Sequence, residues 1–259
     1  MEQLLTNNSK YKIFNNEHTI RDDLIIKNPI PITDSQILEE LYLVIKYTTL
    51  FLEKHQIDYC IESGTLIGCV RHDGIIPWDN DIDIMIFKEG YFKLKTLMNE
   101  YNKNNFKILH VTPGFKLFYK DIAYGELFLY DYDKNENVYR MAYPFINYNG
   151  SLEPTFITSD LYYSNQRYKK EDLFPTQMVL FEDFSVRAPN NIKDVLLTTY
   201  KKNLLECVYS SNKNDQHHAF KYNHYKLAII IEKITVNKIL LFIYIFINWL
   251  ISKQIINIY

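Results

Sequence analysis

Three aspartates at every second position are the strongest chemical signal in the chain. Asp79, Asp81 and Asp83 alternate with isoleucines in the segment WDNDIDIMIF, residues 78–87. Successive side chains of a strand point to opposite faces, so Asp81 and Asp83 are predicted to share one face, ~7 Å apart, while the isoleucines face the core. Two such carboxylates repel each other unless a cation lies between them. Hard oxygen ligands suit Mg²⁺ or Mn²⁺. The alternative is a solvated acidic edge strand.

A glycine-containing turn upstream of the aspartates suits phosphate binding. Gly64 and Gly68 flank Thr65, Leu66 and Ile67, and Arg71 follows at the far end of the short helix expected there. Small residues let the backbone approach phosphate oxygens, and a helix N-terminus offers free N–H groups. The forked donor group of arginine also suits phosphate. This turn, followed by Asp-x-Asp, predicts that one part of the site holds phosphate and the other holds a bridging metal.

The elements that must position these residues are a mixture of helices and strands without a regular βαβ rhythm, which predicts an α+β fold. A helix is expected from Thr33 or Asp34 to Lys54. Either residue can cap its first turn, and Thr33 and Gln36 have the spacing of a capping box. Pro113 and Gly114 indicate a hairpin. Strands are expected at 57–61, 81–87, 106–111, 116–119 and 127–130, helices at 91–101 and 192–203, and mainly helix beyond Pro175.

Composition excludes some classes of function. The chain has 259 residues, 47% of them hydrophobic, and its 29 Lys+Arg against 31 Asp+Glu leave a formal net charge of −2. A dedicated nucleic-acid binder usually has a strong basic excess, so no nucleic-acid partner is expected. Cys60, Cys69 and Cys207 have neither zinc-site spacing nor a disulfide framework, which favours reduced thiols in the cytoplasm.

The two ends of the chain differ in character. Residues 1–32 form an N-terminal extension without the apolar core of a signal peptide, so a cytoplasmic or membrane-associated protein is expected. Residues 239–251 read ILLFIYIFINWLI, which is shorter than the ~20 residues of a spanning helix. A docked hydrophobic helix, an interfacial helix and a membrane anchor all stay open. We therefore divide the chain into 1–32, a catalytic domain at 33–223 and a hydrophobic segment at 224–259.

The segment from Ile61 to Asp83, IESGTLIGCVRHDGIIPWDNDID, resembles the signature of the LicD family. The order of motifs matches: Glu, Gly-Thr-Leu-x-Gly, Arg, and then Gly-x-Ile-Pro-Trp-Asp-x-Asp-x-Asp. Weaker similarity continues at 126–128, 173–175, 181–184, 188–190 and 195–200, so the resemblance covers residues 36–205. The family includes phosphocholine transferases and fukutin-type ribitol-phosphate transferases, within the nucleotidyltransferase-fold superfamily.

This resemblance implies a mixed β-sheet flanked by helices, with a helical C-terminal part, and a metal-dependent transferase. Its donor would be a CDP-linked phospho-alcohol, and its acceptor a hydroxyl on a glycan or glycoconjugate. By position, Asp81 and Asp83 would bind Mg²⁺ or Mn²⁺, and Glu126 would complete the catalytic and metal-binding set where many members have Asp. Asp131 and Asp133 are the alternative third ligands. Either Asp83 or Glu126 would take the proton of the acceptor hydroxyl.

The substrate-binding residues follow from the same motif. Gly64 and Thr65 would lie near the donor phosphates, and Asp79 would support the site from the end of the preceding loop. Glu62 would contact the ligand or cap the glycine turn. Independently of the motif, the charge of Arg71 would offset that of the donor. Lys120 is a second candidate for that role, and a surface role stays open for it.

Two other functions stay open at this stage. A nucleotidyltransferase of the same fold would attach the nucleotide itself to a protein or small molecule. A catalytically inactive member would only bind a ligand. Full retention of function after replacement of Asp81 and Asp83 would favour the inactive member.

Overall fold

The computed structural model describes residues 25–26, 33–111, 114–146, 152–156, 166–200 and 207–208. The hydrophobic segment 239–251 and His217-His218 lie outside these ranges, as does most of the predicted N-terminal extension. Among the helices of the described ranges, none is long and apolar enough to cross a membrane.

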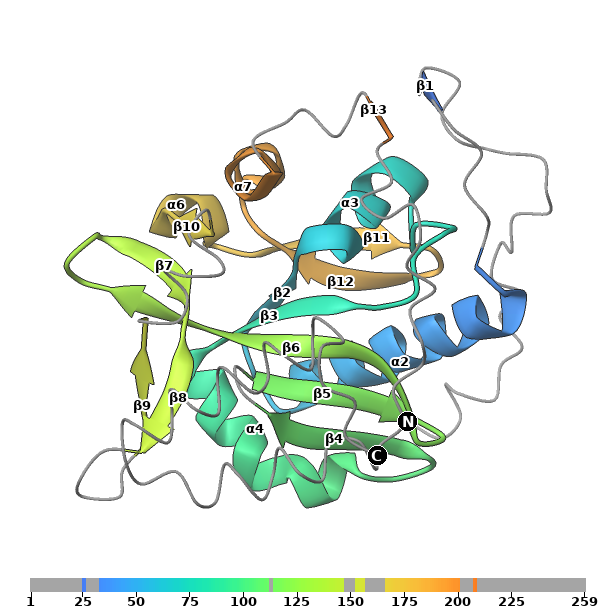
Figure 1. Ribbon diagram of the computed structural model, residues 1–259, viewed down its shortest axis with the longest axis horizontal. Helices are drawn as coiled ribbons and strands as arrows, with labels where there is room; N and C mark the ends of the chain where they lie inside the picture. The colour runs from blue at the N-terminus through green and yellow to red at the C-terminus, as the bar shows by residue number, and fades with distance from the viewer. Residues whose placement is uncertain are drawn as a thin grey trace, which may run out of the picture.

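A mixed β-sheet forms the centre of the molecule, which confirms the predicted α+β class (Figure 1). Its long central strand β6 pairs in parallel with β3 and antiparallel with β5 and β7, while β2 and β4 extend the sheet on either side. The strands of this sheet are β2 (Tyr59–Ile61), β3 (Asp83–Phe87), β4 (Phe106–Val111), β5 (Gly114–Tyr119), β6 (Ile122–Asp133), β7 (Val138–Met141) and β10 (Arg167–Tyr168).

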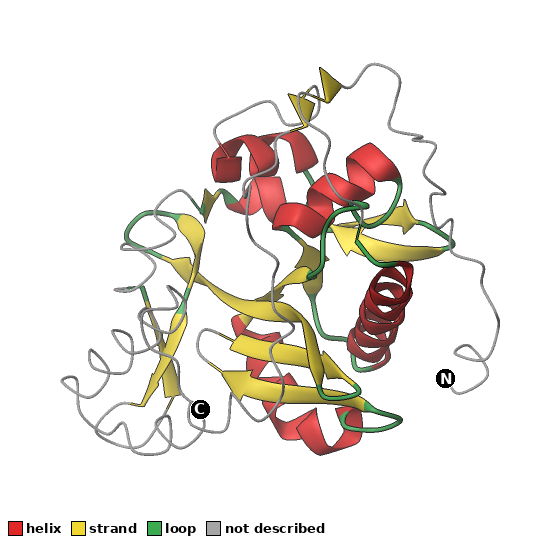
Figure 2. Ribbon diagram, turned by 45° about the vertical axis from the view of Figure 1, so that its right-hand side comes forward, coloured by secondary structure: helices red, strands yellow, loops and turns green. Residues whose placement is uncertain are grey.

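Short two-stranded pairs and five helices surround this sheet in the described residues (Figure 2). The pairs are β1 (Ile25–Ile26) with β13 (Cys207–Val208), β8 (Tyr143–Ile146) with β9 (Leu152–Thr155), and β11 (Gln177–Phe181) with β12 (Phe184–Ala188). The helices are α2 (Ser35–Lys54), α3 (Ser63–His72), α4 (Lys88–Tyr101), α6 (Lys170–Leu173) and α7 (Ile192–Tyr200).

Helices α2 and α4 pack together over one face of the sheet. The Tyr47 hydroxyl of α2 donates to the backbone oxygen of Tyr101 at the end of α4, 2.7 Å away, and the Tyr47 ring stacks on Phe106 of β4 at 3.9 Å between centroids. Ile86 of β3 points toward α4, since its Cγ1 lies 3.4 Å from where a Cβ on Gly90 would be. Because side chains alternate along a strand, Asp83 points to the opposite face.

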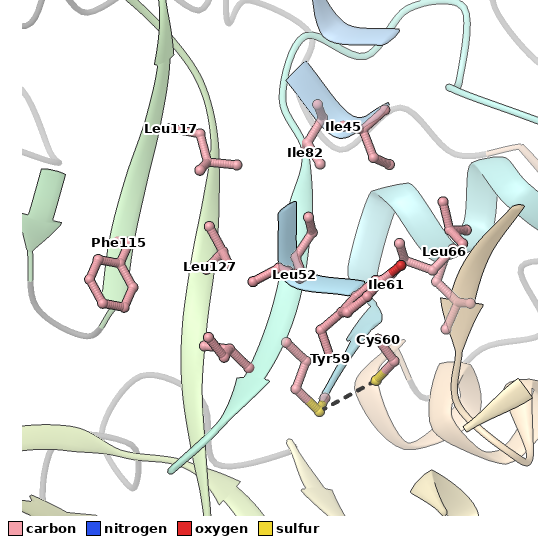
Figure 3. Close-up of a cluster of buried hydrophobic side chains, with 14 of the residues drawn as sticks. Ile45, Leu52, Tyr59, Cys60, Ile61, Leu66, Ile82, Phe115, Leu117 and Leu127 are labelled. Atoms are coloured by element: carbon pink, nitrogen blue, oxygen red, sulfur yellow. Dashed lines mark hydrogen bonds between the residues drawn. The ribbon is translucent and has the colours of Figure 1, made fainter. Parts of the chain in front are cut away.

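The buried core confirms the predicted side of the isoleucines. Ile82, Ile84 and Ile86 are fully buried. Figure 3 shows Ile82 and Leu127 among apolar side chains from α2, β2, α3 and β5. Burial of aliphatic side chains of this size contributes about 1.5–3 kcal/mol each, so the core fixes which face of β3 carries Asp83.

Three predictions of local structure are wrong. Strand β3 begins at Asp83, not at 81, because β2 stops at Ile61 opposite Ile84 and the chain then turns into α3. Asp81 therefore precedes the strand. The capping box at Thr33 does not form: Asp34 accepts the N–H of Gln36, 2.8 Å away, and caps α2 instead.

The third wrong prediction concerns the region beyond Pro175, where helix was expected. Residues 177–188 form the hairpin β11–β12, whose Val186 and Ala188 are buried. The described part of the helix expected at 192–203 is α7 (Ile192–Tyr200), and 201–203 lie outside the described residues.

Candidate active site

Three segments that are distant in sequence meet at the start of β3. The backbone N–H of Glu62, at the end of β2, donates to the Asp83 oxygen at 3.1 Å, and the N–H of Glu126 in β6 donates to the Ile82 oxygen at 2.8 Å. These bonds bring Glu62, Asp83 and Glu126 together, and two further acids come from the loop just before β3. We call these five acids the site cluster. The site cluster comprises Glu62, Asp79, Asp81, Asp83 and Glu126.

Glu126 stands directly beside Asp83, because the two residues are partners in the parallel pairing of β6 with β3. Paired residues in such a ladder project from the same face of the sheet. Gly125 permits this close approach: a Cβ there would lie 2.4 Å from the backbone oxygen of Ile82. An irregularity in the pairing of β5 with β6 lies next to Gly125, at Leu117 and Phe118, and such bulges commonly redirect side chains near active sites. The predicted neighbourhood of Asp83 and Glu126 is thus present.

Asp79 and Gly64 are in close contact. A Cβ on Gly64 would lie 2.7 Å from Asp79 Oδ2 and 4.0 Å from Asp83 Oδ2, so both carboxyl groups face the first turn of α3. The loop is held in place by Thr33, whose hydroxyl donates to the Asp79 backbone oxygen at 2.8 Å. The partial positive charge at the N-terminus of α3 favours these carboxylates. Gly64 therefore has a steric reason to lack a side chain.

Thr65 and Arg71 are both buried on α3. The Thr65 hydroxyl accepts the N–H of Asp83 at 2.9 Å, which fixes the position where β3 begins. Arg71 donates through Nε to His72 Nε2 at 3.0 Å, and its positive charge acts on Asp79. Both residues thus lie at the site and contact its acids through charge or hydrogen bonds.

Glu62 is almost completely buried beneath the site. Its Oε2 accepts a hydrogen bond from the Tyr130 hydroxyl at 2.9 Å, whereas Oε1 has no hydrogen-bond partner among the described residues. Its side chain does not cap α3. A buried carboxyl oxygen without a partner is costly, so a ligand or cation that reaches it would gain a strong contact.

Burial and mutual repulsion raise the pKa values of several acids in the cluster. Burial, reinforced by Asp81, raises the pKa of Asp79 to about 7. Burial raises the pKa of Glu62 to about 8, helped by Glu126 and opposed by the Tyr130 hydrogen bond. Burial followed by the charge of Asp81 also holds the pKa of Asp83 well above its usual range. The carboxyl groups of the site cluster therefore cannot all be ionised at neutral pH unless a cation compensates their charge.

Lys116 supplies one such compensation. It lies opposite Glu126 in the pairing of β5 with β6, and its Nζ is 2.5 Å from Glu126 Oε1. Within the described ranges, no group of three His, Cys, Asp or Glu side chains is arranged to hold a metal ion. A metal held jointly by Asp81, Asp83 and Glu126 would require Glu126 to change its partner.

Two functional candidates were missed by sequence reasoning. Lys116 lies ten residues before Glu126, and only the β5–β6 register reveals the contact. Tyr200, at the end of α7, shares a hydrogen bond with Ser63 and lies near Asp83, Glu62 and Asp79. Burial, together with these acids, raises the pKa of Tyr200 and keeps its hydroxyl protonated. The similarity at 195–200 was a signal for Tyr200, whereas local sequence holds none for Lys116.

The alternative residues lie elsewhere. Asp131 forms an ion pair with Lys88 at 3.4 Å, and Asp133 forms one with Arg140 at 2.6 Å, both toward the far end of β6. Lys120 pairs with Glu40 at 3.0 Å. None of the three therefore joins the site cluster, and Glu126 remains the candidate for the third ligand.

Comparisons with known proteins identify the family of the chain. The family model described as LicD/FKTN/FKRP, nucleotidyltransferase domain, matches residues 56–191, just over half of the chain. The mouse (Mus musculus) ribitol 5-phosphate transferase FKRP is 25% identical over 164 residues, 62% of this chain and 31% of that protein.

Two bacterial relatives match shorter segments. The Haemophilus influenzae lipopolysaccharide cholinephosphotransferase LicD is 42% identical over 48 residues, 18% of either chain. An uncharacterized protein of Rickettsia typhi, RT0683, is 43% identical over 70 residues, 27% of this chain and 23% of its own length. The chain thus spans less than a third of the length of each of these three relatives. The family match over residues 56–191 shows that the chain belongs to the LicD/FKTN/FKRP family of nucleotidyltransferase domains.

Proposed function

We propose that this protein is a metal-dependent transferase that moves a phospho-alcohol group from a CDP-linked donor to a hydroxyl of a glycan or glycoconjugate. The observation that carries the proposal is the convergence of Asp79 and Asp83 at the N-terminus of α3, with Glu126 beside Asp83 on the neighbouring strand. The named activities of two relatives, ribitol 5-phosphate transfer and lipopolysaccharide cholinephosphate transfer, support the class of donor and acceptor.

The acids of the site cluster have the ligand chemistry that Mg²⁺ or Mn²⁺ requires, and Glu126 would have to turn from Lys116 to complete the set. Carboxylate oxygens are hard ligands, and raised pKa values at Asp79, Asp83 and Glu62 mark a site where negative charge lacks compensation. Asp81, Asp83 and Glu126 would hold the ion. When bound, the ion supplies charge neutralisation at the donor diphosphate.

The residues of the chain would position the reaction as follows. The acceptor oxygen bonds to the phosphorus that carries the alcohol, and the bond from that phosphorus to the oxygen bridging toward the nucleotide breaks. CMP leaves with the bridging oxygen, and the acceptor proton passes to Asp83 or Glu126. The first turn of α3, near Gly64, would contact the donor phosphates through backbone N–H groups. Arg71 would limit the repulsion between the donor and Asp79.

The direct test is release of CMP from a panel of CDP-linked donors, with choline, ribitol and glycerol as alcohols, in the presence of Mn²⁺. We expect release with at least one donor, loss of release in Asp81→Asn and Asp83→Asn, and retention in the matched control Asp131→Asn. Absence of nucleotide monophosphate from every donor, in protein shown to bind Mn²⁺, would exclude this donor class.

A second readout distinguishes the alternative functions. With donors labelled in both the nucleotide and the alcohol, transfer of the alcohol label to the acceptor supports the proposal. Nucleotide label on the acceptor would instead favour nucleotidyl transfer. Unchanged function in both aspartate variants would favour a ligand-binding member of the family.

A further inference from the structure

A cleft lies at the end of β3 that is opposite the site cluster. Its volume is about 730 Å³, and its lining comes from β3, α4, β7, α6 and the loop before β2. An opening of this size is within the range of small-molecule sites. Phe87 lines the cleft and follows Asp83 by four residues on the same face of β3, so ~13 Å of strand separates the two. The cleft is therefore distinct from the candidate active site.

Three aromatic rings form the apolar part of the lining, and we call the opening the aromatic cleft. Phe87 lies 5.6 Å from Tyr139 and 4.7 Å from Phe174 between ring centroids, and Tyr139 lies 5.3 Å from Phe174. Phe87 is buried, whereas Tyr139 and Phe174 are half-buried. A ligand in the aromatic cleft would therefore meet aromatic surface that the fold leaves uncovered.

Three acids also line the aromatic cleft. Asp58, Glu89 and Glu171 are exposed there, and no described residue forms an ion pair or a side-chain hydrogen bond with their carboxylates. Burial and the charge of Glu89 raise the pKa of Tyr139, so this carboxylate lies close enough to act on the ring. One ligand group could thus contact the Tyr139 ring and the Glu89 carboxylate together.

The described cations nearby leave these acids in excess. Lys88 pairs with Asp131 at 3.4 Å, and Arg187 donates to Glu53 at 2.7 and 3.0 Å. Lys170 lines the aromatic cleft and is a single cation against its three acids. At neutral pH the lining therefore has an excess of two negative charges, which favours a cationic ligand.

The type of cation follows from the lining. Among the described residues, no three acids are close enough together to hold a metal ion. Aromatic faces attract organic ammonium groups through the ring quadrupole, and the alkyl substituents of such a group can cover the apolar surface. An alkylammonium ion therefore fits both the rings and the dispersed carboxylates.

We propose that the aromatic cleft is a second binding site of this protein, and that its ligand is an organic cation of the alkylammonium class. The alkyl groups of the cation would cover Tyr139 and Phe174, and Glu89 and Glu171 would balance its charge. Binding there needs neither a metal nor a nucleotide, so this proposal and the proposed function can fail separately.

The test compares choline with 3,3-dimethylbutan-1-ol, which has the same shape but carries no charge. Binding of each compound to the full chain is followed by ligand-observed NMR in EDTA and without nucleotide. We expect choline to bind with a Kd on the order of 1 mM, and the neutral compound to bind about tenfold more weakly.

Two variants locate the site. Glu89→Gln removes one charge and Tyr139→Leu removes one ring, and each should weaken choline binding about fivefold. Glu39→Gln is the matched control, because Glu39 is an exposed acid on α2, outside the aromatic cleft, whose carboxylate has no described partner. Its affinity for choline should equal that of the wild type. Urea unfolding checks that each variant is folded, and Glu89→Gln keeps the test valid if Tyr139→Leu is not.

Three results would overturn the proposal. Equal affinities for choline and the neutral compound would show that the charge contributes nothing. Choline binding that is unchanged in Glu89→Gln and in folded Tyr139→Leu would place the cation elsewhere. Absence of choline binding at tens of millimolar would exclude the site altogether. None of these results bears on CMP release, so the proposed function would stand or fall by its own test.

Discussion

Strand β6 contributes to two acidic regions, which differ in how their charges are balanced. The site cluster includes Glu126, in the first half of the strand. A second group, which we call the structural cluster, lies at its end and consists of Asp133, Glu136, Arg140 and Arg167. In the structural cluster each acid has an arginine partner: Asp133 and Arg140 are 2.6 Å apart, and Glu136 lies 3.2 Å from Arg140 and 2.7 Å from Arg167.

The pKa values of the acids in the two clusters are shifted in opposite directions. Burial acts to raise the pKa of Asp133, but the N–H groups of Asn135 and Glu136 and the Arg140 guanidinium outweigh burial and hold this pKa below its usual value. In the site cluster, burial and neighbouring acids raise the pKa values of Asp79, Glu62 and Asp83. Paired acids thus serve the fold, whereas acids in excess of their cations mark a place where a ligand supplies the missing charge.

The largest effect is expected from Asp83→Asn. This variant removes a ligand charge where the developing charge of the reaction is stabilised, so CMP release should fall about 10³-fold. Its free energy of unfolding should not fall, because the raised pKa of Asp83 shows that the folded state already disfavours the charge. The rate of CMP release tests the first expectation, and urea unfolding tests the second. If Asp83→Asn lost stability but kept its rate of CMP release, Asp83 would belong with the acids that serve the fold.

The reciprocal variant, Asp133→Asn, should affect stability and spare the site. Its Oδ2 accepts from the buried Arg140 at 2.6 Å, and breaking a buried, charge-assisted hydrogen bond costs about 2–3 kcal/mol. Urea unfolding measures this loss. Mn²⁺ affinity and CMP release per folded molecule should match those of the wild type, and a selective loss of Mn²⁺ binding would place Asp133 in the site after all.

The two clusters should also respond oppositely to pH in metal-free protein. An acid whose folded pKa is raised binds its proton more tightly when folded, so its contribution to stability is present below the unfolded pKa near 4 and is lost as pH rises through the folded value. For Asp79, with its pKa at about 7, stability should therefore fall between pH 4 and pH 7. Asp133, with its lowered pKa, instead loses its contribution as pH falls below ~4.

Urea unfolding in EDTA from pH 5 to pH 8 measures this slope. Asp79→Asn should make the fall in unfolding free energy with pH shallower, by less than ~1.4 kcal/mol per pH unit, which is the limit for one proton. Saturating Mg²⁺ should flatten it further, because bound cation favours the ionised acids. An equal slope in wild type and Asp79→Asn would show that Asp79 does not titrate in this range.

Local pattern predicted one part of the site well and another part poorly. The alternation of Asp83 with buried isoleucines identified the acidic face of β3, because period-two burial is a property of consecutive residues. The start of the strand was wrong because it depends on where β2 ends, at Ile61. The contact of Lys116 with Glu126 depends on the register of two strands and on the irregularity beside Gly125. Such pairings are not encoded in any short segment.

A long-range contact also explains why Thr33 does not cap α2. Its spacing to Gln36 fits a capping box, yet its hydroxyl donates to the backbone oxygen of Asp79, 46 positions later in the chain. Asp34 takes over the cap because its carboxylate reaches the N–H of Gln36. Local rules offered two equivalent caps at this point, and a long-range hydrogen bond selected one of them.

The smallest effect on the fold is expected from Gly64→Ala. Its Cβ would lie 2.7 Å from Asp79 Oδ2, the end of a side chain that can move, while alanine improves helix propensity by about 0.5–1 kcal/mol over glycine. These terms oppose each other, so the free energy of unfolding should change by less than ~1 kcal/mol. The displaced Asp79 carboxyl should nevertheless weaken Mn²⁺ binding and CMP release, each by several-fold.

Gly90→Ala provides the matched control for this last prediction. A Cβ on Gly90 would meet Ile57 Cγ2 at the same distance of 2.7 Å, a methyl group of a buried isoleucine, on α4 and away from the site. The two variants thus impose similar crowding in a helix and differ in whether an acid of the site cluster must move. Equal Mn²⁺ affinities in Gly64→Ala, Gly90→Ala and the wild type would mean that the position of the Asp79 carboxyl does not matter for the metal, and the site cluster would then reduce to Asp81, Asp83 and the acids beside them.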